Sequence, residues 1–240
     1  MYKKELLNYF TGPIAYIVIG LFLLLISLFL WVIPGEWNIV DSGYAQTDGL
    51  FRLTPWLFLF LCPALTMRMF AEERQKGTWQ MLLTKPVSLT RIVTAKFLAA
   101  WTLVVIALLP CLIHLVAVYN ISEPRGNVDV AAFFGSFAGL LFVSMSFTAI
   151  GTFASAFSKN QIVCFIVSAA ACAMFFFGFD LLASFPLCSD WVTMLQHIGG
   201  NKHFLSLERG VIELADVVYF LVVSVFFVSS TIVCLQHRYD

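Results

Sequence analysis

Hydrophobic residues in this chain are gathered in six long stretches that carry no Asp, Glu, Lys or Arg. A helix needs about 20 apolar residues to cross a hydrocarbon layer about 30 Å thick. The six stretches, which reach or approach that length, are 6–35, 53–67, 97–122, 130–158, 160–179 and 217–237. None shows the alternation at every second residue that a transmembrane barrel strand requires. The pattern therefore predicts an all-α, polytopic integral membrane protein with six transmembrane helices.

Composition supports this class of protein. Of the 240 residues, 60% are hydrophobic and only 12% are charged, whereas a soluble domain has about 25% charged residues. The net charge is zero, so no bulk electrostatic attraction favours a nucleic-acid partner. The lipid bilayer is the partner that composition predicts, and nucleic acid is not expected.

The second stretch is the weakest candidate span, because its uncharged part has only 15 residues. Arg52 and Arg68 stand at its two ends, and the long stems of arginine side chains can reach outward to the lipid headgroups. Removing this span would place the block 68–96, with six basic residues, on the outer side. We therefore expect six spans and not five.

Orientation follows from the distribution of Lys and Arg, which are enriched in cytoplasmic loops near the ends of spans. With both chain ends in the cytoplasm, ten basic residues lie inside and four outside. The inner set is Lys3, Lys4, Arg68, Arg74, Lys76, Lys85, Arg91, Lys96, Lys159 and Arg238, and the outer set is Arg52, Arg125, Lys202 and Arg209. The sequence thus predicts an N-in, C-in topology.

These signals divide one transmembrane domain, 1–240, into nine segments. We expect spans at 13–33, 52–70, 93–119, 130–157, 161–181 and 216–236, a cytoplasmic segment at 72–92 between spans two and three, and helices at the outer membrane surface within 182–215. Residues 1–12 have the spacing of a short interfacial helix, with a break at Gly12 and Pro13. The open alternative for this part is a plain extension of the first span.

The cytoplasmic connection 72–96 reads EERQKGTWQMLLTKPVSLTRIVTAK. Thr78 is a good N-cap for about two helical turns, which end before Pro86, and Ser88 can cap the next span. The result would be a short amphipathic helix that presents Trp79, Leu82 and Leu83 to lipid or to a groove on another protein. An ordinary positively charged loop resting on the bilayer is the alternative.

A family resemblance enters at these residues. The stretch FAEERQKGTWQMLLTKPVSLTRIVTAK resembles the connection between spans two and three of type-2 ABC exporter permeases. Two further stretches, RLTPWLFLFLCPALTMRMF and NKHFLSLERGVIELADVVYFL, are similar to the gliding-motility-associated permease subunits (GldF) and, more distantly, to copper-related permeases (NosY). The chain departs from the usual pattern at Gln80, where Glu is frequent, and at Ala95, where Gly is common.

This resemblance implies that the cytoplasmic segment is a coupling helix, which docks in a groove of an ABC ATPase subunit. The coupling residues carried over are Glu72, Glu73, Arg74, Gly77, Thr78, Trp79, Leu82, Leu83 and Pro86. It also implies an outer gate formed by His203, Phe204, Arg209 and Gly210. Because six helices are few to enclose a pathway, a second permease copy or a related membrane subunit is expected.

This chain is expected to be a permease subunit without catalytic activity of its own. A phosphate-binding loop needs glycine-rich backbone followed by Lys, and none of the 14 glycines is followed by Lys. No cofactor is therefore expected here, and ATP and Mg²⁺ would belong to the partner ATPase. The resemblance places the protein in the bacterial inner (plasma) membrane. The cargo stays open among lipid, polysaccharide and protein.

The fourth stretch carries small and hydroxyl residues at a spacing of about four. Small residues allow helices to approach closely, and hydroxyl groups can bond across them. These helix-packing residues are Gly135, Gly139, Ser144, Thr148 and Thr152. They predict packing within the chain, with a dimer seam or a translocation path as the alternative.

Two other classes of function compete with transport. An intramembrane zinc protease would need H-E-x-x-H, which is missing, and the spacing of His197, His203, Cys188 and Asp190 fits no established metal site. A membrane scaffold that anchors an ATPase without transport requires no motif that this sequence lacks, so it stays an alternative. Co-purification with an ATPase would separate the enzyme from the permease, and substrate-dependent ATP hydrolysis in proteoliposomes would separate the permease from the scaffold.

Overall fold

A computed structural model describes residues 1–44, 46–79, 88–184 and 197–237. Within this part of the chain, six helical segments are long and apolar enough to cross a membrane. They are Pro13–Trp31, Asp48–Gln75, Leu89–Ile121, Val130–Ser155, Gln161–Ala183 and Leu214–His237. The predicted all-α class with six membrane-spanning helices is confirmed.

Three of the spans are built from more than one helical element. The second consists of α4 (Asp48–Thr66) and α5 (Ala71–Gln75); the third of α7 (Leu89–Leu108), a 3₁₀ turn (Leu109–Cys111) and α8 (Leu112–Ile121); the fifth of α10 (Gln161–Ala173), a π turn (Met174–Gly178) and α11 (Phe179–Ala183). The others are α2 (Pro13–Trp31), α9 (Val130–Ser155) and α14 (Leu214–His237). Shorter helices are α1 (Tyr2–Thr11), α3 (Ile39–Ser42) and α13 (Gly200–Glu208).

The second span begins earlier than the expected 52–70, because α4 starts at Asp48. An acidic residue in the first turn of a helix is favourable, since it faces the positive end of the helix dipole. The earlier start puts Arg52 inside the helix instead of at its end. There its Nε atom lies 2.9 Å from Glu208 Oε1, so that an ion pair joins α4 to α13.

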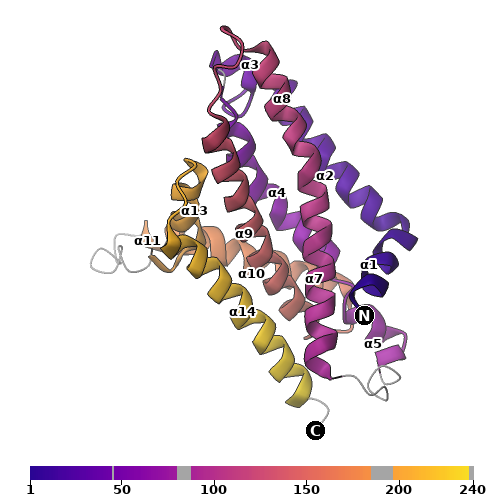
Figure 1. Cartoon of the computed structure of the whole chain (residues 1–240). Helices are drawn as coiled ribbons and strands as arrows, with labels where there is room; N and C mark the ends of the chain where they lie inside the picture. Colours follow the sequence, from indigo (N-terminus) through magenta and orange to yellow (C-terminus); the bar gives the residue numbers. More distant parts are fainter. Residues whose placement is uncertain (45, 80–87, 185–196, 238–240) are drawn as a thin grey trace.

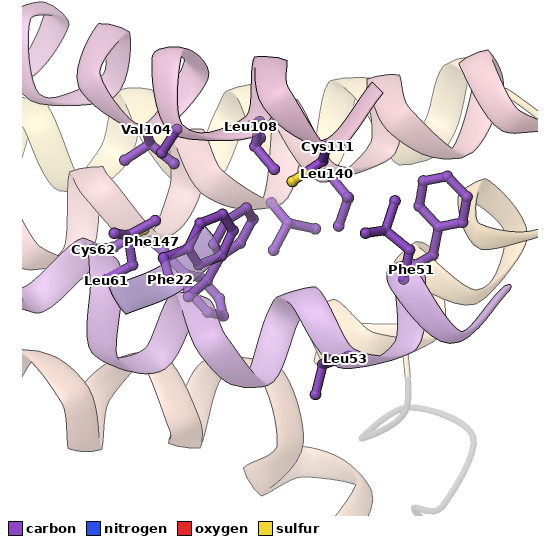
Figure 2. Packing of buried hydrophobic residues seen from close by; sticks show 14 of the residues in the cluster. Phe22, Phe51, Leu53, Leu61, Cys62, Val104, Leu108, Cys111, Leu140 and Phe147 are labelled. Carbon is purple, nitrogen blue, oxygen red and sulfur yellow. The ribbon is translucent and has the colours of Figure 1, made fainter. Parts of the chain in front are cut away.

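Helix α9 lies at the centre of the bundle and packs against α4, α7, α10, α13 and α14 (Figure 1). The main core cluster unites side chains from α2, α4, α7 and α9, and Figure 2 shows Phe22, Val104, Leu140 and Phe147 from this cluster turned toward one another. The exposed hydrophobic side chains of α2, α10 and α14 lie outside this core. Such faces suit contact with lipid chains.

The two ends of the bundle are clearly separated. The start of α1, the end of α14 and α5 lie at one end, and α3 and the end of α8 lie at the other (Figure 1). The distribution of Lys and Arg predicts that the first end is the cytoplasmic one. Gly12 is extended and joins α1 to α2, so that α1 packs against α7.

Candidate functional site

The cytoplasmic connection leaves the bundle through α5 and then turns sharply at Gly77. This glycine has φ +71°, a left-handed conformation that glycine adopts far more readily than other residues. Its N–H donates to the carbonyl of Arg74 at 3.4 Å, which closes the turn. The backbone is helical again at Thr78 and Trp79. Gly77 therefore sets the direction in which the chain continues toward residue 80.

Trp79 is turned into the protein. The sequence predicts that it faces outward, but its side chain is only 2% exposed and packs edge-on against Phe70, with ring centroids 5.5 Å apart. The residues that form this second hydrophobic cluster with Phe70 and Trp79 are Met69, Ile92, Val93, Ala100, Ala156 and Leu235. The prediction for Trp79 was wrong, because a large apolar ring gains more from burial in this cluster than from exposure.

Polar contacts attach the same segment to its neighbours. Arg74 is buried, and its guanidinium Nη1 donates to the carbonyl oxygen of Ala156 at the end of α9. Lys96 on α7 is 4% exposed and donates to Glu73 at 2.7 Å and to Glu5 at 3.1 Å. Lys96, Glu5 and Glu73 join α1, α5 and α7, and we call them the Lys96 triad. The cytoplasmic segment is thus held to three helices by buried contacts.

Helix α1 is also attached to the bundle through Tyr9. The phenol hydroxyl donates to the carbonyl of Leu65 at 3.0 Å. Burial, reinforced by the carboxylates of Glu5, Glu73 and Glu72, raises the pKa of this phenol well above its usual range. Tyr9 therefore remains a hydrogen-bond donor at any physiological pH, and α1 stays attached to the end of α4.

The remaining predicted coupling residues divide into three groups: half-buried, exposed, and outside the described part of the chain. Glu72 is half-buried and pairs with Lys76 at 2.6 Å. Gly77 and Thr78 are exposed, as are the neighbouring residues Gln75 and Lys76, which were not predicted to take part in coupling. Leu82, Leu83 and Pro86 lie outside the described residues. Between Ala71 and Trp79, the exposed surface of the segment is therefore the short stretch 75–78.

The predicted outer segment is represented by α13, which is not confined to the surface. Phe204 is 2% exposed and Leu207 is fully buried in the core cluster. These residues occur three apart on one helical face, so one side of α13 enters the bundle against α9 while the other stays polar. The sequence predicted helices in or on the outer membrane surface for 182–215, and in α13 one face of such a helix is packed into the bundle.

The four predicted gate residues do not form one site. Phe204 and Arg209 line an outer cavity of about 540 Å³, together with aromatic residues of α4 and α9. His203 instead faces α14, where its Nδ1 lies 2.7 Å from Asp216 Oδ1 and its ring stacks on Tyr219. Gly210 faces α9. Two of the four residues therefore line a cavity, and the other two contact α14 and α9.

Asp216 is a functional candidate that sequence reasoning missed. It is 5% exposed at the start of α14, and it accepts hydrogen bonds from Ser206 and from His203. The sequence did contain a signal, since Asp216 is a carboxylate at the beginning of an apolar span. A buried acid there needs hydrogen-bond donors close by, and this indicates a polar contact. The pairing of Lys96 with Glu5 was also missed. Basic residues are ordinary at a cytoplasmic span end, so Lys96 gave no signal of a buried ion pair.

Gly135 and Gly139 lie where α9 meets α13. A Cβ atom at Gly135 would fall 2.4 Å from the carbonyl oxygen of Gly210, and one at Gly139 would fall 2.7 Å from Leu207 Cβ. The two glycines thus allow the outer segment to approach α9 closely. Gly210 itself has φ +77°, and a Cβ atom there would lie 2.4 Å from Ala132 Cα.

The three hydroxyl residues that the sequence singled out on α9 are hydrogen-bonded inside the chain. Thr148 and Thr152 each donate to the carbonyl four residues earlier at 2.7 Å, and Trp101 Nε1 donates to Ser144 Oγ at 3.2 Å. Ser144, Thr148 and Thr152 are all fully buried. In this structure the helix-packing residues contact other parts of the same chain.

Six membrane helices, with a cytoplasmic connection held to the bundle by buried contacts, define a polytopic membrane subunit. The sequence profile of the ABC-2 family transporter proteins matches residues 38–198, which is about two thirds of the 240 residues. The chain belongs to this family. No curated protein matches the chain in sequence. The family places the protein among multi-pass permease subunits of ABC transporters, and this confirms the resemblance to type-2 permeases at the level of the family.

Proposed function

We propose that this permease couples ATP hydrolysis on a separate ABC ATPase to export, and that segment 72–88 is the docking element. The observation that carries the proposal is the division of the described part of this segment. Arg74 and Trp79 are buried in the bundle, while 75–78 are exposed between them. A segment attached on both sides of an exposed turn can pass a push from a partner to the helices that hold it.

The helices that would receive the push are identified by the buried contacts. Arg74 connects the segment to α9, and Glu73 connects it through Lys96 to α7 and α1. The packing of Trp79 on Phe70 connects it to the turn between α4 and α5. Displacement of the exposed turn would therefore move α1, α7 and α9 together, because packed cores change between discrete arrangements.

The finer assignments follow from the same proposal. ATP and Mg²⁺ would be bound by the partner ATPase, and a second permease copy or a related membrane subunit would complete the pathway. The similarity of 52–70 and 201–221 to the gliding-motility-associated permeases supports a gliding-motility exporter in the bacterial inner membrane. Phe204 and Arg209, which line the outer cavity, would act at the outer gate.

Gly77→Pro tests the docking element. Proline fixes φ near −65° and removes the N–H, whereas Gly77 has φ +71° and donates to Arg74. The variant should lose most of the ATPase activity that co-purifies with the tagged permease, about tenfold or more. Vanadate-sensitive phosphate release in detergent measures this, and the thermal midpoint of the permease alone should change little because the turn is exposed.

Gly43→Pro is the matched control at the opposite end of the molecule. Gly43 has φ +67°, donates to the carbonyl three residues earlier at 3.4 Å, and has open space around it, as Gly77 does. This variant should retain the co-purified ATPase activity. Equal activity in the two variants would refute the docking role of the segment.

A further inference from the structure

A cavity of about 500 Å³ opens at the cytoplasmic end of the bundle, between α1, the start of α2 and the region where α4 passes into α5. Its volume lies in the range of ligand sites, about 300–1,000 Å³. The residues that line it include basic, acidic and apolar side chains from these elements. The cavity adjoins the exposed turn 75–78, of which Lys76 and Thr78 also line it.

The charges around the cavity balance and are mostly paired. Three basic side chains and three carboxylates line it: Arg68, Lys76, Lys96, Glu5, Glu72 and Glu73. Lys96 pairs with two of the carboxylates, and Lys76 pairs with the third. These pairs use all three carboxylates. Arg68 is the cation that no carboxylate of the described residues accompanies.

Arg68 is also incompletely hydrogen-bonded. Its Nε atom is buried and has no hydrogen-bond partner among the described residues. A buried donor without an acceptor is unfavourable, and native proteins satisfy such groups with a partner, water or a ligand. A guanidinium group presents donors in a planar fork that fits two oxygens of a phosphate. The chemistry at Arg68 therefore calls for an oxyanion.

The other side of the cavity favours a lipid as the source of that phosphate. Pro13, Ile14, Ala15, Ala64 and Leu65 line it where α2 and α4 enter the bundle. These two helices are membrane-spanning segments, so the cavity lies where headgroups of the cytoplasmic leaflet meet the protein.

We propose that this cavity binds an inner-leaflet phospholipid, with its phosphate on Arg68 and its acyl chains along the apolar side. Because the lining charges sum to zero, a zwitterionic headgroup keeps the site neutral, whereas an anionic one would leave an excess negative charge. The ammonium group of phosphatidylethanolamine would face Glu72, whose side chain is 31% exposed. This inference stands apart from the proposed function, because lipid binding requires no ATPase.

Lipid binding can be measured on the full-length permease alone. The thermal midpoint of the delipidated protein in detergent is followed against rising concentrations of four probes: dioctanoyl phosphatidylethanolamine, dioctanoyl phosphatidylglycerol, dioctanoylglycerol and inorganic phosphate. A ligand that binds only the folded state raises the midpoint as its concentration exceeds Kd. Phosphatidylethanolamine should raise the midpoint most, phosphatidylglycerol less, and the other two probes not measurably.

Variants at Arg68 assign the effect to this residue. Arg68→Gln should raise the Kd for phosphatidylethanolamine about 10- to 100-fold, because hydrogen bonds between the guanidinium and the phosphate are lost. Arg68→Lys keeps the positive charge but loses the planar pair of donors, and it should raise Kd about tenfold or less. This variant serves as the test if Arg68→Gln does not fold. Arg91→Gln, at an exposed arginine of α7 outside the cavity lining, should bind as the unmodified chain does.

Four results would overturn the proposal. Unchanged affinity in both Arg68 variants would show that the phosphate does not lie on this residue. An equal midpoint shift with inorganic phosphate would identify a free-anion site, and an equal shift with dioctanoylglycerol would identify an apolar groove. Tighter binding of phosphatidylglycerol would contradict the zwitterionic headgroup.

Discussion

Replacing Lys96 by Met should lower the stability of the folded permease by about 3 kcal/mol, because it leaves the carboxylates of Glu5 and Glu73 without their cation. Lys96 is 4% exposed and donates to both. Removing one partner from a buried ion pair costs about 3–5 kcal/mol, and the lower end applies here since the two carboxylates are partly exposed. An SDS titration of the detergent-solubilised protein measures the loss.

The same experiment contains its own rescue and control. Adding Glu5→Gln and Glu73→Gln to Lys96→Met should restore most of the lost stability, because an uncharged replacement of a buried ion pair is often neutral. Lys76→Met removes a lysine whose side chain is 65% exposed, and it should change stability by only about 0.5 kcal/mol. Equal losses for Lys96→Met and Lys76→Met would show that the Lys96 triad does not hold α1 and α5 in place.

Gly135→Ala should destabilise the outer part of the bundle by about 2–3 kcal/mol, toward the upper end of the cost of overpacking. The added Cβ atom would fall 2.4 Å from the carbonyl oxygen of Gly210. That oxygen belongs to the backbone, so it cannot yield by a change of rotamer, and overpacking of this kind costs about 1–3 kcal/mol. Faster amide hydrogen exchange in α13 should accompany the lower thermal midpoint.

Gly20→Ala is the control for this substitution. Gly20 lies within α2, and no atom beyond its own helix backbone lies within 4 Å of the place that a Cβ atom would take. Because Ala is favoured over Gly inside a helix by up to about 1 kcal/mol, this variant should be as stable as the unmodified chain or slightly more stable. If Gly135→Ala behaved in the same way, the close approach of α9 to the turn at Gly210 would be disproved.

The sequence predicts the helical class and the number of spans well because both depend on local composition. Uncharged stretches mark the spans directly, since a bilayer tolerates few unpaired charges. The early start of α4 at Asp48 was not visible in this way. The sequence placed Arg52 at the end of a span, whereas its pairing with Glu208 from α13 depends on a residue 156 positions away in the chain.

The candidate site was predicted as a set of residues but not as an arrangement. The sequence marked Trp79 as a surface residue, because periodicity shows which residues share a helix face and not what covers that face. Phe70, Ile92 and Leu235, which cover it, come from three other parts of the chain. The same limit hid the Lys96 triad, since a lysine at a span end has the same local sequence whether it is solvated or buried.

Gly135 and Gly139 of α9 were marked correctly as contact residues, but the sequence did not show what they contact. Gly135 and Gly139 were singled out by their spacing, and the predicted gate residue Gly210 was singled out by resemblance. Nothing in the sequence related these two groups. The structure places Gly210 directly against Gly135, so the outer segment and the central helix form one contact.

The cytoplasmic position of the exposed turn 75–78 is the central claim, and cysteine labelling tests it most directly. Gln75→Cys, in a chain with Cys188 and Cys234 replaced by Ser, is exposed to a membrane-impermeant maleimide in right-side-out and in inside-out vesicles. Asp41→Cys on the exposed α3 reports the opposite face. The account predicts labelling of Gln75→Cys only in inside-out vesicles, and labelling in right-side-out vesicles alone would contradict it.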